Sequence, residues 1–274
     1  MGRGQAYGVT VSNRYTRHRQ PFMTTPSYND INAHSRDCLL SFDADTHTYY
    51  YDGREMVSVT TLVDNCFPKF DSEYWAQRKA MKEGLDPQVI LDRWTREAER
   101  ARELGTSMHE RIERYYLGED TLDDTDSLRL FRLFAANNRL YPYRTEWRIY
   151  HEDYDLAGTL DFLERTPDGT FNIYDWKRSK KLIEADGRII CESPYHATGL
   201  HPVSHIPDTS YWHYALQLSI YRFILEERYG IRVSQLKLGV FHPSYSTPWI
   251  VTLPYLLTEV RAILRHKCCP TPVL

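Results

Sequence analysis

The chain has 274 residues, of which 42% are hydrophobic and 26% are charged, and its formal net charge is −3. This length allows one large domain or two small ones with a sizeable core, and the composition is that of an ordinary globular protein. The net charge excludes a general affinity for polyanions, although a local basic groove remains compatible with it.

Cysteine usage and hydropathy indicate an intracellular protein. The cysteines are odd in number, contain no CxxC motif and include one adjacent pair, so they argue against a secreted disulfide framework and against a zinc or iron–sulfur site. They are Cys38, Cys66, Cys191, Cys268 and Cys269. The N-terminus has no apolar signal segment, and no run of about 18 apolar residues occurs. We expect a soluble protein with reduced thiols.

The N-terminal part is expected to contain a polar arm followed by a hairpin. Residues 1–37 are polar and show little periodicity, so we expect a disordered or loosely packed arm. We expect residues 38–274 to form a single domain. Asp52-Gly53 between two strand-like runs is a strong signal for a β-hairpin.

Residues 72–140 are expected to be helical. Ser72 is a candidate cap for a helix that ends near Gly84, and Asp86-Pro87 is typical of the start of the next helix. Ser107 and Glu110 form a candidate capping box for a further helix that ends at Gly118. The alternative is one long helix that continues across Gly105. Another helix is expected over about 126–140.

The pattern then changes to the alternation of β-strands, over residues 143–177. Thr166-Pro167-Asp168-Gly169 is typical of a tight turn, and a three-residue loop there would pair Thr166 with Thr170. Counting back along both strands places Asp161 opposite Asp175.

The C-terminal part predicts a long loop, a helix, two strands and a last helix. Their expected ranges are 183–210, 211–228, 234–242, 247–252 and 254–266. We therefore expect an α/β fold with a central mixed β-sheet flanked by helices, in which residues of about 143–266 form the catalytic sheet and its helices.

Asp161, Asp175 and Lys177 are the first candidates for a site. Alternate residues of a strand share a face, so Asp175 and Lys177 point the same way, and the hairpin register brings Asp161 to them. Two close carboxylates repel each other, and a hard divalent cation such as Mg²⁺ relieves the repulsion. The alternative is an ion pair on a solvated sheet face.

Three further features support the site interpretation. His109, four residues after Gly105, is a usable metal ligand, although a surface or core histidine is the alternative. Gly158 precedes Asp161 by three residues, where a small residue permits close backbone approach. Gln217 and Tyr221 lie one turn apart on one helix face.

The ordered motifs GxxxH, GxxD, DxK and QxxxY, over residues 105–221, resemble those of the RecB-like branch of the PD-(D/E)XK nuclease superfamily. That branch includes phage exonucleases and the mitochondrial genome maintenance exonuclease. The resemblance implies a restriction-endonuclease-like core and a metal-dependent DNA nuclease.

The resemblance also implies roles for single residues. His109, Asp161, Asp175 and the carbonyl of Trp176 would bind Mg²⁺ or Mn²⁺, and Lys177 would be the catalytic lysine. Gln217 and Tyr221 would support the site or contact DNA, and Glu146 is a plausible extra carboxylate or else an outward-facing strand residue. Some relatives carry an iron–sulfur cluster, which we do not expect here because no spaced cysteine group is present.

Basic residues beside these motifs are candidate DNA contacts, since they would neutralise phosphates. They are Arg93, Arg96, Arg100, Arg178, Lys180 and Lys181. The alternative for the arginines is a solvated helix face that pairs with nearby glutamates. Aromatic candidates for base stacking, which are more typically core residues, are Trp94, Tyr115, Tyr116 and Tyr211.

The expected function is an exonuclease that acts on DNA ends with single-stranded character, in recombination, repair or replication. A separate helicase, recombinase or single-strand-binding protein would be its partner, with no membrane involved. A bacterial or phage-infected cytoplasm is the expected location, and an organelle stays open. The alternatives are a structure-specific or nicking endonuclease, a catalytically silent DNA-binding protein of the same fold, and an unrelated sheet domain that binds a small ligand.

Overall fold

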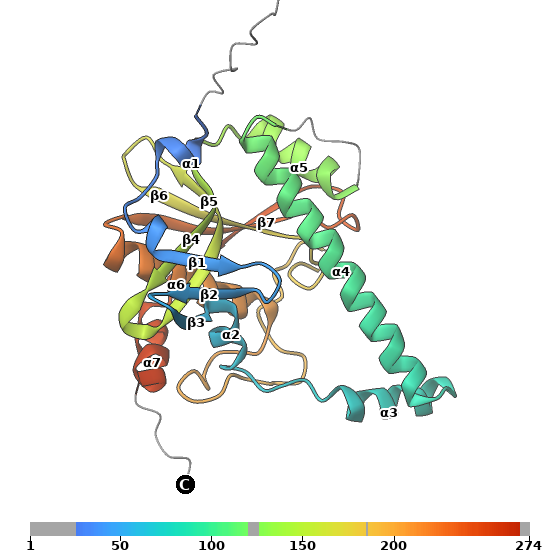
Figure 1. The fold of residues 1–274 in the computed structure, drawn as a ribbon. Helices are drawn as coiled ribbons and strands as arrows, with labels where there is room; N and C mark the ends of the chain where they lie inside the picture. The colour runs from blue at the N-terminus through green and yellow to red at the C-terminus, as the bar shows by residue number, and fades with distance from the viewer. Residues whose placement is uncertain (1–25, 120–125, 185, 269–274) are drawn as a thin grey trace, which may run out of the picture.

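A computed structural model describes residues 26–119, 126–184 and 186–268 of the chain (Figure 1). Within these residues the protein is a mixed α/β structure in which helices flank one central sheet. The helices are α1 (Tyr28–Ile31), η1 (Asp37–Leu39), α2 (Val59–Asp64), α3 (Ser72–Glu83), α4 (Pro87–Tyr116), α5 (Asp126–Asn137), η2 (Glu152–Tyr154), α6 (Ser210–Arg228) and α7 (Leu257–Cys268). The strands are β1 (Leu40–Asp43), β2 (Thr48–Tyr51), β3 (Arg54–Ser58), β4 (Pro142–His151), β5 (Leu156–Arg165), β6 (Phe171–Lys177), β7 (Val233–Val240) and β8 (Trp249–Leu253).

The sheet is mixed, as expected, and β5 is its branching point. The order is β1-β2-β3-β5-β6-β7-β8, and β4 pairs with β5 along the other edge of that strand. The pairs β3–β5 and β6–β7 are parallel, and the other pairs are antiparallel. α6 connects the parallel strands β6 and β7, because parallel neighbours need a crossover.

The N-terminal hairpin agrees with the sequence. Asp52 and Gly53 connect β2 to β3, and both have positive φ, 49° and 72°. A two-residue type I′ turn requires this conformation at both central positions. The hairpin then joins the main sheet through the short parallel pairing of β3 with β5.

The helical segment differs from its expected boundaries in two places. The side chain of Asp71, one residue before Ser72, caps α3 by accepting a hydrogen bond from the backbone N–H of Tyr74. α4 is a single helix of 30 residues that begins at the expected Asp86 cap and continues through Gly105. The capping box of Ser107 and Glu110 is therefore wrong, and the continuous helix is correct. Figure 1 shows that α3 and the first half of α4 project from the body of the molecule.

Two layers of helices cover the sheet, each with its own core. Buried residues of α2, α6 and α7 pack against one face, where Leu216, Ile220 and Ile263 are examples. Met108 and Ile112 of α4 pack with α5 against aromatic side chains on the other face. The sheet thus separates α4 from α6, which is important because each helix supplies residues to the site.

The N-terminal prediction is wrong for the residues that the structure describes. Residues 26–37 pack against β4 instead of forming a loose arm, while residues 1–25 lie outside the described part. The Asn29 side chain bonds both backbone and side chain of Thr145, and Asp37 accepts hydrogen bonds from Arg144 and from the Trp147 indole. Side chain–backbone bonding of this kind has no periodic sequence signal.

The segment 183–210 is a loop, as expected, and its described part contains two isolated β-bridges.

The hairpin between β5 and β6 has the predicted register, since Arg165 pairs with Phe171 and Phe162 pairs with Tyr174. Among the described helices, none is long and apolar enough to cross a membrane.

Candidate metal centre and active site

The site lies where β5 changes its partners. Leu156 and Ala157 of β5 pair with β3, whereas residues 162–165 pair with β6 on the same edge of the strand. The intervening residues 158–161 have no strand partner on that edge, so the sheet opens there. Gly158 and Asp161 of the GxxD motif occupy this opening.

The alternation of side chains also breaks at Asp161. Leu160 and Leu163 both belong to the core that includes α6, although strict alternation would place them on opposite faces. Phe162 belongs to the opposite core. Asp161 therefore lies at a switch between the two faces, where groups from both helix layers can reach it.

Glu146 of β4 lies at the matching position and is strained. The β4–β5 ladder pairs Thr145 with Phe162 and Trp147 with Leu160, so Glu146 stands opposite Asp161 between them. Its φ of 44° falls in the left-handed region, which is uncommon for a residue with a side chain. Such strain costs free energy and is typical of functional sites.

His109 of α4 completes a group with these two carboxylates. Its Nδ1 lies 3.4 Å from Asp161 Oδ2 and 4.0 Å from Glu146 Oε1. Its Nε2 lies 2.6 Å from the carbonyl oxygen of Trp176. Among the described residues, His109, Glu146 and Asp161 form the one candidate metal group, with ligand atoms within 4.8 Å of one another.

Asp175 and Lys177 of β6 form an ion pair beside this group. Lys177 Nζ lies 2.6 Å from Asp175 Oδ2, and Gln217 Nε2 makes a long contact of 3.5 Å with Asp175 Oδ1. The backbone N–H of Trp176 donates to Asp161 Oδ2 over 2.8 Å, so the end of β6 contacts a β5 side chain. The predicted ligand Asp175 thus adjoins the candidate metal group without belonging to it.

α6 supports the ion pair from one face of the sheet. Gln217 Nε2 also contacts the hydroxyl of Tyr221 over 3.4 Å, and a Cβ on Gly158 would meet the Tyr221 ring at 2.7 Å. The small residue expected at position 158 therefore makes room for Tyr221. Together with Glu146, Asp161, Asp175 and Lys177, these residues line one hollow of about 310 Å³.

Two residues of the site, Tyr214 and Arg148, are not among those predicted from the sequence. Lys177 Nζ lies 4.8 Å from the centre of the Tyr214 ring, a cation–π contact. Arg148 of β4 lines the hollow. Tyr214 precedes Gln217 by three residues on the same helix face, a spacing that identifies it once Gln217 is chosen. Arg148 follows Glu146 by two residues, but nothing in the sequence separates it from other exposed strand arginines.

The carboxylates are electrostatically perturbed. Burial, and then the charge of Asp161, raise the pKa of Glu146 to about 9. Burial raises the pKa of Asp175 to about 6, against the opposing effect of Lys177. Burial by itself lowers the pKa of Lys177, but the charges of Asp175 and Asp161 outweigh it and raise the pKa above its usual range. Perturbed titrating groups in one hollow are typical of functional sites.

The residues present fit a hard divalent cation. Two carboxylates and one imidazole lie together, and a cation would relieve the repulsion from Asp161 that adds to burial in raising the pKa of Glu146. Carboxylate oxygens suit Mg²⁺ and Mn²⁺, and imidazole is a common ligand of transition metals.

The predicted DNA contacts fall into two groups. Arg93, Arg96 and Arg100 precede His109 by 16, 13 and 9 residues, which at 3.6 residues per turn places them mainly on the far side of α4. Arg93 also pairs with Glu83 over 2.8 Å. These three arginines therefore do not face the candidate metal group, whereas Arg102, seven residues before His109, lies on its side of the helix.

The second basic group follows β6 directly. Lys180 and Lys181 are exposed, and Arg178 begins the same stretch one residue after Lys177. The charges of Arg178 and Lys180 act on His242, so the basic stretch lies beside the end of β7. These residues follow Lys177 directly in the chain and stay predicted DNA contacts.

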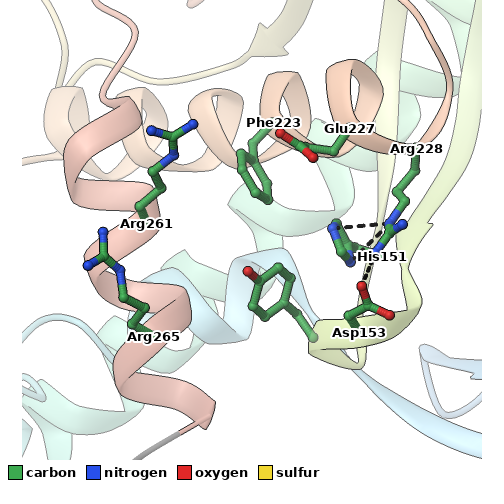
Figure 2. A pocket seen from close by; sticks show the side chains of 8 residues that line it. His151, Asp153, Phe223, Glu227, Arg228, Arg261 and Arg265 are labelled. Atoms are coloured by element: carbon green, nitrogen blue, oxygen red, sulfur yellow. Dashed lines mark hydrogen bonds and ion pairs between the residues drawn. The ribbon is translucent and has the colours of Figure 1, made fainter.

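A second hollow of about 310 Å³ lies between α6, α7 and the end of β4 (Figure 2). It contains a polar network around the buried His151, in which Arg228 Nε lies 3.2 Å from His151 Nε2 and the guanidinium pairs with the exposed Asp153. Arg261 and Arg265 of α7 face the same hollow. None of these residues belongs to the candidate metal group.

Comparisons with known proteins assign no family to the chain. No family model matches it, and no curated protein matches it. One similar solved structure is described as "Crystal structure of SSO0001"; at 15% identity it covers 78% of this chain and 76% of that chain, with a TM-score of 0.33. A TM-score this low carries no argument, so the functional conclusion depends on the site.

Proposed function

We propose that this protein is a metal-dependent deoxyribonuclease of the RecB-like branch of the PD-(D/E)XK superfamily. The observation that carries the proposal is the convergence of His109, Glu146 and Asp161 within 4.8 Å, beside the 2.6 Å ion pair of Asp175 and Lys177. The antiparallel strands β4–β5–β6, extended by the parallel β7 across α6, fit a restriction-endonuclease-like core.

The chain's own residues would act on a phosphodiester in complementary ways. The raised pKa of Lys177 favours its ammonium form, which suits a group that neutralises charge developing on a phosphate. Asp175 would hold the ammonium in place, and Gln217, which also contacts the Tyr221 hydroxyl, would orient Asp175. The basic stretch after Lys177 would contact the flanking phosphates.

His109, Glu146 and Asp161 would hold Mg²⁺ or Mn²⁺, with Asp175 and the carbonyl of Trp176 next to them. Bound there, the ion would supply Lewis-acid chemistry at the phosphate. The strain at Glu146 fits this role, because a backbone held in the left-handed region fixes the direction of the carboxylate.

The decisive test is the variant Lys177→Ala. We expect it to lose metal-dependent cleavage of end-labelled DNA by on the order of 10²-fold or more, since it removes the cation aimed at the reacting phosphate. Lys237→Ala is the matched control, because Lys237 lies on the adjacent strand and bonds Tyr174 away from the site. Undiminished cleavage by folded Lys177→Ala protein would refute the assignment.

The subtype proposed is an exonuclease that acts on ends with single-stranded character, a preference that rests on the resemblance to RecB-like nucleases. A helicase, recombinase or single-strand-binding protein would then supply or protect the strand. Covalently closed circular DNA separates this from a structure-specific or nicking endonuclease, since a strict exonuclease leaves the circle intact. Metal binding without cleavage of any DNA would instead support a silent DNA-binding protein.

A further inference from the structure

A hollow of about 520 Å³ lies at the end of α4, away from the candidate metal group. It is bounded by α1, the ends of α4 and α5, and the start of β4, which Figure 1 shows at one end of the molecule. The lining residues that matter for its chemistry are Tyr28, Tyr115, Tyr116, Asn138 and Arg139.

The aromatic rings of this hollow are held by local packing. Tyr115 and Tyr116 stand at 73° to each other with ring centres 5.3 Å apart, and both pack on Phe131 of α5. Tyr28 is brought to the hollow by α1, which is fastened to β4 through Asn29 and Asn32. Tyr28 and Tyr115 remain 40% and 36% exposed, so their rings are accessible to a ligand.

The polar groups of the hollow suit a planar ligand that carries negative charge. Among the lining residues that the structure describes, Arg139 is the one charged side chain. The Tyr116 ring packs on Phe162 and its hydroxyl is buried, so Tyr116 forms the inner wall of the hollow. Asn138 donates to the carbonyl of Phe134, and its side-chain oxygen stays available as an acceptor.

The hollow lies within a few nucleotides of the candidate metal group. Tyr116 follows His109 by seven residues of helix, about 10 Å at 1.5 Å per residue. Pro142 precedes Glu146 by four residues of strand, about 13 Å at roughly 3.3 Å per residue. At about 3.4 Å per stacked nucleotide, a single strand covers this distance with three or four nucleotides.

We propose that this hollow binds an unpaired nucleotide of the strand whose phosphodiester lies at the candidate metal group. The base stacks on the exposed rings of Tyr28 and Tyr115, the polar edge of the base meets Asn138, and a phosphate meets Arg139. The inference rests on the proposed function for its substrate, but nucleotide binding is measurable without cleavage.

The test is the binding of oligothymidylates of two to eight nucleotides in chelator, followed by fluorescence anisotropy or calorimetry. The wild-type affinity is expected to rise in a step at about four nucleotides. Tyr115→Ala is expected to remove that step and to weaken binding of the longer strands about tenfold or more, since stacking on one aromatic ring contributes this much. Tyr195→Ala, at a tyrosine 74% exposed on the distant loop, is the matched control.

Arg139→Gln is a second and conservative variant at an exposed position. It is expected to weaken binding of the longer strands and to lower the salt dependence by about one phosphate contact. Arg165→Gln, at an exposed residue that does not line the hollow, is its control.

The outcomes separate the two proposals. Wild-type affinity that does not depend on strand length, or Tyr115→Ala and Arg139→Gln proteins that bind every length like the wild type, would overturn the nucleotide site even if metal-dependent cleavage persists. A length step that Tyr115→Ala removes, in a protein that cleaves no DNA with any metal, would support the nucleotide site and overturn the nuclease proposal.

Discussion

At the scale of single residues, the site depends on a missing side chain at Gly158. The Tyr221 ring is 97% buried and occupies the space that a Cβ would need. Because Tyr221 contacts Gln217, and Gln217 contacts Asp175, a shift of this ring would pass to the ion pair with Lys177. Gly158 therefore positions the site without contacting substrate.

Gly158→Ala is expected to destabilise the protein by about 1–3 kcal/mol, because the added methyl group overpacks a buried ring. Urea unfolding at equilibrium measures the change. Gly53→Ala is not a suitable control, since its positive φ adds backbone strain of its own. An unchanged midpoint for Gly158→Ala would show that α6 can move away from β5 at no cost.

Metal binding at the residue scale can be measured apart from catalysis. We expect Mn²⁺ in excess to raise the melting temperature of the wild type, since a ligand at about 100 times its Kd stabilises by about 2.7 kcal/mol. Asp161→Asn and Glu146→Gln are expected to lose most of this increase. Asp186→Asn, at a loop carboxylate that pairs with Arg188, is the control. Equal stabilisation of all four proteins would place the ion elsewhere.

At the scale of elements, α4 connects the projecting helical segment, formed by α3 and the first half of α4, to the site. It carries His109 in its C-terminal half and packs on α3 in its N-terminal half, around Ala76, Ala80 and Ile90. Gly105 lies one turn before His109 in the middle of this helix. Because α4 is one continuous helix, the position of its projecting N-terminal half is coupled to the position of His109.

Gly105→Ala is expected to stabilise the protein by up to about 1 kcal/mol, because alanine has the higher helix propensity and a Cβ at this position meets no atom within 4 Å. Thermal and urea unfolding measure the gain. A stabilised variant that cleaves DNA more slowly would indicate that the substrate strand passes close to this glycine. A destabilised variant would contradict the open space at Gly105.

At the scale of the whole molecule, the network around His151 connects the end of β4 to α6, which is distant in sequence. His151 ends β4, its ring stacks on Phe223 of α6 with planes 9° apart, and Arg228 of α6 bonds it (Figure 2). Burial, and then the positive charge of Arg228, lower the pKa of His151 to about 4. The folded protein therefore holds this histidine neutral.

This predicts a pH dependence of global stability. An unfolded histidine has a pKa of about 6.5, so between about pH 6.5 and pH 4 the unfolded chain binds more protons than the folded protein. His151 therefore contributes a rise in stability with pH across this window, and up to about 3 kcal/mol of that contribution is lost as the pH falls through it. His151→Gln is expected to show a shallower loss, measured by urea unfolding at several pH values.

Asp175 and Glu146 give the opposite slope over much of this window, because their pKa values are raised on folding to about 6 and about 9. The effect of His151 is therefore measured by the difference in unfolding free energy between wild type and His151→Gln at each pH. His205→Gln, at a histidine with a 63% exposed side chain, is the control. Parallel pH profiles for wild type and His151→Gln would refute the assignment.

Local patterns in the sequence predicted the elements and much of the site. The Asp52-Gly53 turn, the Asp86 cap before Pro87 and the Thr166–Thr170 loop each depend on the backbone preferences of a few adjacent residues, and the structure contains all three. The loop fixed the β5–β6 register, and with it the approach of Asp161 to the end of β6. Helical spacing likewise placed Gln217 and Tyr221 on one face.

Only the tertiary structure decided where side chains from the two faces of the sheet come together. The branching of β5 between β3 and β6, and the strained backbone at Glu146, bring His109 from one face toward Asp175 and Lys177 on the other. Strand periodicity cannot show this, because it assumes that alternation continues unbroken. The far-side position of Arg93, Arg96 and Arg100 depends on whether α4 continues through Gly105, which the sequence left open. The anchoring of α1 on β4 depends on contacts between segments distant in sequence, which no local pattern contains.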